Sequence, residues 1–127
     1  MDLLLDTHVF LWWDEGGERL APEARSMIAD PASQIFVSAA SVWEIAIKRR
    51  LGKLGFTKSA LAAIETNHFA GLPITIADAE RAGSLAWEHR DPFDRMLVAQ
   101  CLESSLTLVT CDAAMRTFGG IAILWAG

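Results

Sequence analysis

Several features that define other classes of protein are scarce in this sequence or missing from it. There are two cysteines, Cys101 and Cys111, which are too few and too unpatterned for a disulfide framework or a zinc motif. No apolar run approaches the roughly 18 residues that a membrane-spanning helix needs. The opening residues, MDLLLDTH, carry acidic side chains on both sides of a short apolar core, which is wrong for a secretory signal. We therefore expect a cytoplasmic protein that does not enter a membrane.

Linkers, internal repeats and low-complexity segments are also missing. We therefore expect one domain over residues 1–127. A chain of this length buries roughly two-thirds of its unfolded surface around one core. Apolar residues make up 52% of the sequence and are spread along it, which excludes intrinsic disorder.

Basic residues are outnumbered, since 11 Lys and Arg against 16 Asp and Glu give a net charge of −5. This balance argues against non-specific binding of nucleic acid by bulk electrostatics. Many of the basic residues nevertheless fall in one short stretch, here called the basic cluster: Lys48, Arg49, Arg50, Lys53 and Lys58. A solvated helix end explains the cluster, because Lys and Arg suit helix C-termini. The alternative is a rim that contacts phosphates or a partner.

Short apolar runs alternate with longer helical patterns along the chain. The apolar runs predict strands at residues 3–5, 35–37, 72–75, 106–109 and 121–124. The remaining patterns predict helices at residues 7–13, 22–30, 38–50, 57–69, 77–88, 93–104 and 112–117. Strands that are short, apolar and separated by helices indicate an α/β fold with a parallel sheet covered on both faces.

Four carboxylates from distant segments are expected at one edge of that sheet. Sites in open α/β sheets lie beyond the carboxyl ends of the strands. Asp6 directly follows the first strand, and Asp112 ends the stretch LVTCD at the fourth. Asp94 opens the helix that leads into the fourth strand, and Glu44 lies on the apolar helix that leaves the second.

Each of these residues also has a purely structural explanation. Asp6 and Asp112 suit the N-caps of the helices that follow them. Asp94 suits the first turn of its helix, where a negative charge faces the positive end of the dipole. Glu44 can pair with Lys48, four residues further on. A convergence of all four carboxylates is harder to attribute to capping.

The negative charges of clustered carboxylates repel one another and must be compensated. Two of them ~5 Å apart repel by roughly 3 kcal/mol at an effective dielectric constant near 20. Several together are stable only if some are protonated or a cation lies among them. With oxygen ligands and no set of Cys or His, the cation is expected to be Mg²⁺ or Mn²⁺. Such an ion neutralises the charge that develops in phosphodiester displacement, so the carboxylates indicate a metal-dependent nuclease.

Four fragments carry a resemblance to a known family: LLLDTH, SVWEIAIK, HRDPFDRMLVAQ and LVTCD. In this order and at this spacing they resemble the PIN-domain ribonucleases, and among these the VapC-like toxins of toxin–antitoxin pairs. The resemblance spans essentially the whole chain. It implies a three-layer α/β/α sandwich with a short-stranded parallel sheet. It also implies an acidic tetrad that binds metal and performs catalysis, formed here by Asp6, Glu44, Asp94 and Asp112.

Neighbours of the tetrad take supporting roles in this interpretation. Asp91, in HRDPFDR, looks like an N-cap or a support for the metal ligands. Thr7 and Thr110 can donate hydrogen bonds that orient the adjacent carboxylates, although plain packing explains them equally well. His8 stands where many relatives have Asn, and we expect it to pack beneath the site.

The resemblance further implies an activity and partners. One or two Mg²⁺ or Mn²⁺ ions would bind the scissile phosphate of RNA, and cleavage would leave a 5′-phosphate and a 3′-hydroxyl. A cognate antitoxin would lay an apolar helix into a groove and send a basic side chain into the acidic cleft. Candidates to line that groove are Leu11, Trp12, Trp43 and Leu51. A homodimer is expected. The alternative is a PIN-fold metal-binding, RNA-binding or regulatory module without significant cleavage activity.

Overall fold

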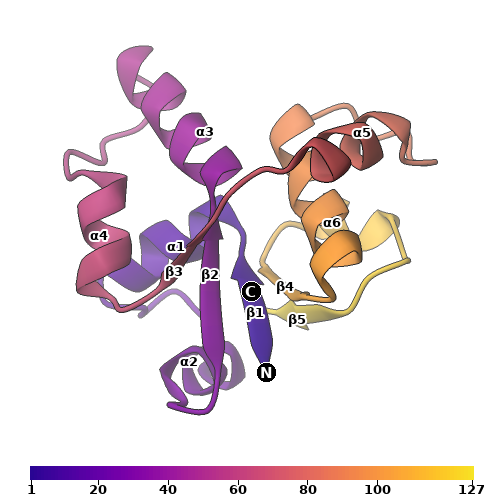
Figure 1. The fold of residues 1–127 in the computed structure, drawn as a ribbon. Coiled ribbons are helices and arrows are strands. Elements are labelled where there is room, and N and C mark those ends of the chain that lie inside the picture. Colours follow the sequence, from indigo (N-terminus) through magenta and orange to yellow (C-terminus); the bar gives the residue numbers. More distant parts are fainter.

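One parallel sheet organises the chain, and the computed structural model describes all 127 residues. Its five strands lie in the order β3-β2-β1-β4-β5 (Figure 1). β1 is central and pairs in parallel with β2 on one side and β4 on the other. The strand bounds are β1 (Asp2–Leu5), β2 (Gln34–Ser38), β3 (Ala70–Leu72), β4 (Thr107–Thr110) and β5 (Ile123–Trp125). The carboxyl end of β1 therefore lies between those of β2 and β4.

Helices cover both faces of this sheet, which confirms the predicted three-layer α/β/α sandwich (Figure 1). None of the helices combines the length and the hydropathy of a membrane span. The helices are α1 (Thr7–Asp14), α2 (Pro22–Ala29), α3 (Ala39–Arg50), α4 (Ala60–Thr66), α5 (Ile76–Ser84), α6 (Pro92–Ser104) and the 3₁₀ helix η1 (Ala113–Thr117).

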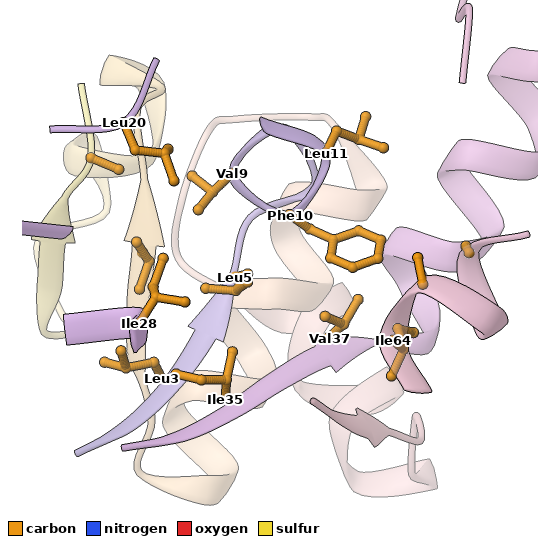
Figure 2. Close-up of a cluster of buried hydrophobic side chains, with 14 of the residues drawn as sticks. Leu3, Leu5, Val9, Phe10, Leu11, Leu20, Ile28, Ile35, Val37 and Ile64 are labelled. Atoms are coloured by element: carbon orange, nitrogen blue, oxygen red, sulfur yellow. The ribbon is translucent and has the colours of Figure 1, made fainter. Parts of the chain in front are cut away.

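Successive side chains of β1 point to opposite faces of the sheet, so the core has two layers. Leu3 and Leu5 belong to the larger cluster, where side chains of α1, α2 and α4 meet the sheet (Figure 2). Leu4 points to the opposite face and packs with Leu97 and Val98 of α6. All three leucines are fully buried. Burying each apolar side chain contributes about 1.5–3 kcal/mol, so β1 is held from both faces and its carboxyl end is a firm base for a site.

Three predicted elements differ most from those observed, while the others agree to within one or two residues at each end. The strand predicted at 72–75 is β3, at Ala70–Leu72, because Pro73 has no N–H to continue the ladder. The helix predicted at 57–69 is the shorter α4, whose N-cap Ser59 accepts a hydrogen bond from the Ala62 N–H. The helix predicted at 77–88 is α5, which ends at Ser84.

Arg95 on α6 explains why α5 ends early. Its guanidinium donates hydrogen bonds to the carbonyl oxygens of Ala82 (2.9 Å), Leu85 (3.0 Å), Trp87 (2.7 Å) and His89 (3.0 Å). These donors satisfy carbonyls that further helical turns would otherwise have to satisfy. Residues 85–91 therefore follow a fixed, non-helical path from the end of α5 to the start of α6.

Candidate active site

Asp6 follows β1 and is 6% exposed. Its Oδ1 accepts a hydrogen bond from the Thr7 N–H at 2.7 Å, which caps α1. Its Oδ2 accepts a hydrogen bond from the Thr110 hydroxyl of β4 at 2.6 Å. Burial raises the pKa of Asp6, and the two hydrogen bonds oppose that rise. The predicted capping role of Asp6 and the predicted Thr110 contact both exist, and they hold one carboxylate at the edge of the sheet.

Glu44 on α3 reaches the same edge and is also 6% exposed. Its Oε1 accepts a hydrogen bond from the Thr7 hydroxyl at 2.6 Å. Its Oε2 forms an ion pair with Lys48 Nζ at 2.6 Å. Thr7 thus contacts Asp6 through its backbone and Glu44 through its side chain. The negative charge of Glu44 contributes to the raised pKa of Asp6, as expected for carboxylates that share a site.

The two aspartates of HRDPFDR have separate roles in the structure. Asp91 is the N-cap of α6, and its Oδ1 accepts hydrogen bonds from the N–H groups of Phe93 (2.9 Å) and Asp94 (3.1 Å). Asp94 does not cap the helix. Its Oδ2 lies 2.7 Å from Nε2 of His89. Burial raises the pKa of Asp94 to about 6, the nearby carboxylates of Asp91 and Asp6 add to the rise, and the His89 hydrogen bond opposes it.

Asp112 differs from the other three carboxylates, which are buried or half-buried. It is exposed, and its Oδ1 accepts a hydrogen bond from the Ala114 N–H at 2.9 Å, which caps η1. Its own N–H donates to the Thr110 hydroxyl oxygen at 3.0 Å, and that hydroxyl donates in turn to Asp6. The structure therefore links Asp112 to the site through its backbone, while its carboxylate performs the capping role that the sequence also allowed.

The carboxylates carry protein partners that a cation would have to replace. No group of three or more His, Cys, Asp or Glu side chains is arranged to hold a metal ion. Glu44 is engaged by Lys48, and Asp94 by His89. The donors themselves are oxygens of buried or half-buried carboxylates, which is the chemistry that Mg²⁺ and Mn²⁺ select. Burial raises the pKa values of Asp6 and Asp94, and neighbouring carboxylates add to the rise in each case.

Lys48 is the positive charge closest to this group. The hydrogen bond to Glu44 raises the pKa of Lys48, and the carboxylates of Asp91 and Asp94 raise it further. Its side chain is 39% exposed, so its charge is partly screened by solvent. The predicted pairing of Glu44 with Lys48 is therefore present together with the predicted approach of Glu44 to Asp6.

Other members of the basic cluster are occupied within the chain. Arg49 donates hydrogen bonds to the carbonyl oxygens of Phe56 and Lys58, which fastens the segment between α3 and α4. Lys58 pairs with Asp14 of α1 at 2.9 Å. Arg50 and Lys53 are exposed and form no ion pair. Besides Arg49, whose guanidinium is bound to carbonyl oxygens, these two residues are the cations of the cluster that have no ion pair within the chain.

Two residues in contact with the site were not singled out from the sequence, and one expectation was wrong. Ser41 is fully buried, and its Oγ lies 2.9 Å from Thr7 Oγ1. A small polar residue three positions before Glu44 on an apolar helix was the available signal. His89 was part of the HRDPFDR motif without an assigned role. His8 is exposed, with its ring centroid 6.3 Å from that of Trp12, so it does not pack beneath the site.

Comparison with known proteins places the chain in a family. The sequence profile of the PIN domain matches residues 3–121. The chain belongs to the PIN-domain family. It is 30% identical over 118 residues to Ribonuclease VapC22 of Mycobacterium tuberculosis, an alignment that covers 91% of this chain and 90% of that protein.

Solved structures show the same fold. A chain of VapBC2 from Rickettsia felis, bound to a DNA fragment from its promoter, superposes with a TM-score of 0.74 over 100% of both chains at 12% identity. A chain of DNA-bound VapBC from Salmonella typhimurium gives a TM-score of 0.73 over 98% of both chains at 18% identity. Identities this low establish the fold alone.

Proposed function

We propose that this protein is a metal-dependent endoribonuclease, the toxin of a toxin–antitoxin pair. One observation carries the proposal. Asp6 and Glu44, brought from distant parts of the chain, are both buried at the carboxyl edge of the sheet and joined through Thr7. The charge of Asp6 also acts on Asp94. Burial of acidic groups costs free energy, and capping accounts for only Asp6 among these three. The ribonuclease relative, at 30% identity, adds to the support.

In this proposal Asp6, Glu44 and Asp94 hold Mg²⁺ or Mn²⁺. The ion supplies Lewis acidity at the scissile phosphate and neutralises charge in the transition state. Thr7 and Thr110 fix the orientation of Asp6, and the Asp91 cap fixes the first turn of α6 that carries Asp94. Asp112, exposed at the rim, completes a second site or orients the attacking water. The products are a 5′-phosphate and a 3′-hydroxyl.

The test is cleavage of total RNA by purified protein in Mn²⁺ and in chelator, with the cut ends mapped. Asp6→Ala and Asp94→Asn are compared with wild type. Asp2→Asn is the matched control, because Asp2 is an exposed carboxylate at the opposite end of the same strand as Asp6. Circular dichroism and melting temperature establish that each variant folds.

We expect cutting in Mn²⁺ that chelator abolishes, that both site variants lose and that Asp2→Asn retains. Ends carrying 2′,3′-cyclic phosphate would contradict the proposed chemistry, because they require attack by the 2′-hydroxyl of the substrate. Folded protein that binds Mn²⁺ without cutting any RNA would instead favour a binding or regulatory module.

The antitoxin that the proposal requires has a fitting surface on α3 and α4. A groove of about 480 Å³ is lined almost entirely by apolar side chains, among them Trp43, Leu61 and Leu72. Trp43 is 61% exposed and Leu61 is 64% exposed. None of the four acidic residues lines this groove, and the lining residue nearest to them in sequence is Trp43, which precedes Glu44 on α3. Leu11 lies in the core, so it does not line such a groove.

The other expected partners are the RNA substrate and a second copy of the chain. Arg50 and Lys53, which are free of ion pairs, are the members of the basic cluster available to RNA phosphates. The homodimer stays a prediction, tested by sedimentation at micromolar concentration.

A further inference from the structure

A second cavity lies beside the carboxylates, between residues 86–89 and η1. Its volume is about 870 Å³, and its lining residues are Ala86, Trp87, Glu88, His89, Ala114 and Thr117. Each of its two walls contains a residue that contacts a carboxylate of the candidate site. His89 on one wall contacts Asp94 at 2.7 Å, and Ala114 on the other donates its N–H to Asp112 at 2.9 Å. A group bound in this cavity therefore lies next to the place where RNA would be cut.

The first wall is a pair of aromatic rings held in place. The centroids of Trp87 and His89 are 4.6 Å apart, and their planes are inclined by 34°. The Trp87 indole N–H donates to the Thr117 hydroxyl oxygen at 2.9 Å, and the centroids of the Trp87 and Phe118 rings are 5.6 Å apart in a T-shaped arrangement. Arg95 fixes the backbone of both ring residues through their carbonyl oxygens. Rings that are ordered before a ligand arrives lose little conformational entropy when they bind it.

The chemistry of the cavity selects a nucleobase over a phosphate. Fixed aromatic side chains beside a nucleic-acid path bind unstacked bases, because every base presents a π-face. The cavity volume falls within the range of small-molecule pockets, roughly 300–1,000 Å³. Glu88 contributes a negative charge to the lining, which repels phosphate and accepts hydrogen bonds from base amino groups.

We propose that this cavity binds one nucleobase of the RNA strand, next to the phosphate that is cut at the carboxylates. The assignment rests on the proposed ribonuclease function and adds a determinant of target choice to it. Trp87 is the stacking platform, and His89, which packs on Trp87 and contacts Asp94 at 2.7 Å, places that platform beside the cleavage site.

The test measures nucleobase binding without cleavage. Uniformly ¹⁵N-labelled protein in chelator is titrated with AMP, CMP, GMP and UMP, and the indole N–H signals of its five tryptophans are followed. The Trp87 signal is the one missing from the spectrum of Trp87→Phe. Ribose 5-phosphate is the control ligand, since it carries the sugar and phosphate without a base. We expect a saturable shift of the Trp87 signal with at least one nucleotide and none with ribose 5-phosphate.

A Trp87 signal that stays still with all four nucleotides, or moves equally with ribose 5-phosphate, overturns the proposal. A second measurement uses an oligonucleotide that contains the mapped cut site. Trp87→Leu is expected to raise its KM about tenfold with kcat within about threefold, whereas Trp87→Phe keeps a ring and stays close to wild type. If Trp87→Leu and Trp87→Phe impaired KM and kcat to the same extent, Trp87 would only support the fold. If cutting is absent but the titration succeeds, the ribonuclease proposal fails while the nucleobase site stands.

Discussion

Replacement of Asp94 by Asn is expected to stabilise the metal-free protein at neutral pH. The pKa of Asp94 is raised to about 6, above the value of about 3.9 in an unfolded chain. The folded state therefore holds the Asp94 proton more tightly than the unfolded state does. Below about pH 4 the Asp94 carboxyl is protonated in both the folded and the unfolded state, so its titration does not change the free energy of unfolding. Between about pH 4 and 6 the unfolded state loses its proton first, so the free energy of unfolding falls as pH rises.

The magnitude follows from the size of this shift. About two pKa units correspond to an upper bound near 3 kcal/mol at about 1.36 kcal/mol per unit. Asp94 is partly exposed, with a side-chain exposure of 14%, and it also gains from the dipole of α6. We therefore expect a net gain of about 1 kcal/mol for Asp94→Asn, or about 4 °C in melting temperature for a domain of this size.

Metal is expected to reverse the order of the two proteins. A divalent cation at about a hundred times its Kd stabilises wild type by about 2.7 kcal/mol, and Asp94→Asn loses most of that gain. The assay is thermal unfolding at pH 4 and pH 7.5, in chelator and in Mn²⁺. At pH 7.5 the variant should melt higher than wild type in chelator and lower than wild type in Mn²⁺. At pH 4 in chelator it should not melt higher than wild type.

Asp91→Ala provides the contrast within the same motif. It removes the cap of α6, which costs about 1 kcal/mol whether or not metal is present. If Asp94→Asn instead melts lower than wild type in chelator and keeps the full response to Mn²⁺, Asp94 is structural and the reasoning is refuted.

Three further outcomes follow from the contacts described. Lys48→Met leaves Glu44 without its cation, so Mn²⁺ should bind several-fold more tightly by calorimetry, and weaker binding would show that Lys48 does not compete with metal. Thr110→Val removes the hydroxyl that orients Asp6, so metal affinity should fall about tenfold with the fold retained, and an unchanged affinity would limit Thr110 to packing. Changing Arg50 and Lys53 together to Gln should weaken RNA binding and flatten its dependence on salt, and an unaltered salt slope would exclude phosphate contacts at these positions.

The sequence predicted the positions of Asp6 and Glu44 because their placement depends on the backbone. Strand alternation and the order of elements bring the residues that follow β1 and β2 to one edge. The side-chain partners could not be predicted in the same way. Whether Glu44 would face Lys48 or the other carboxylates depends on rotamers and on Thr7, which is distant in sequence. Asp112 shows the same limit, since its strand-end position was predictable, while the sequence left open whether its carboxylate would cap η1 or join the other carboxylates.

Element boundaries depended on contacts that no local pattern contains. β3 is a short edge strand that includes Gly71, so its apolar signal is weak and the pattern was assigned to the residues after it. The end of α5 is determined by Arg95, which lies beyond the segment it shapes. Propensity within residues 85–88 could not reveal that their carbonyls would be taken by a side chain from α6.

The Arg95 contacts also affect which substitutions this protein can accept during evolution. Its guanidinium is bound only to backbone carbonyl oxygens, and every residue type supplies one of these. Substitutions in residues 85–89 therefore leave these acceptors in place, and the Arg95 contacts do not depend on which side chains the segment carries. Loss of the single arginine would release all of these contacts at once. The wall of the cavity beside Asp94 is thus a place where target preference can diversify without a change of fold.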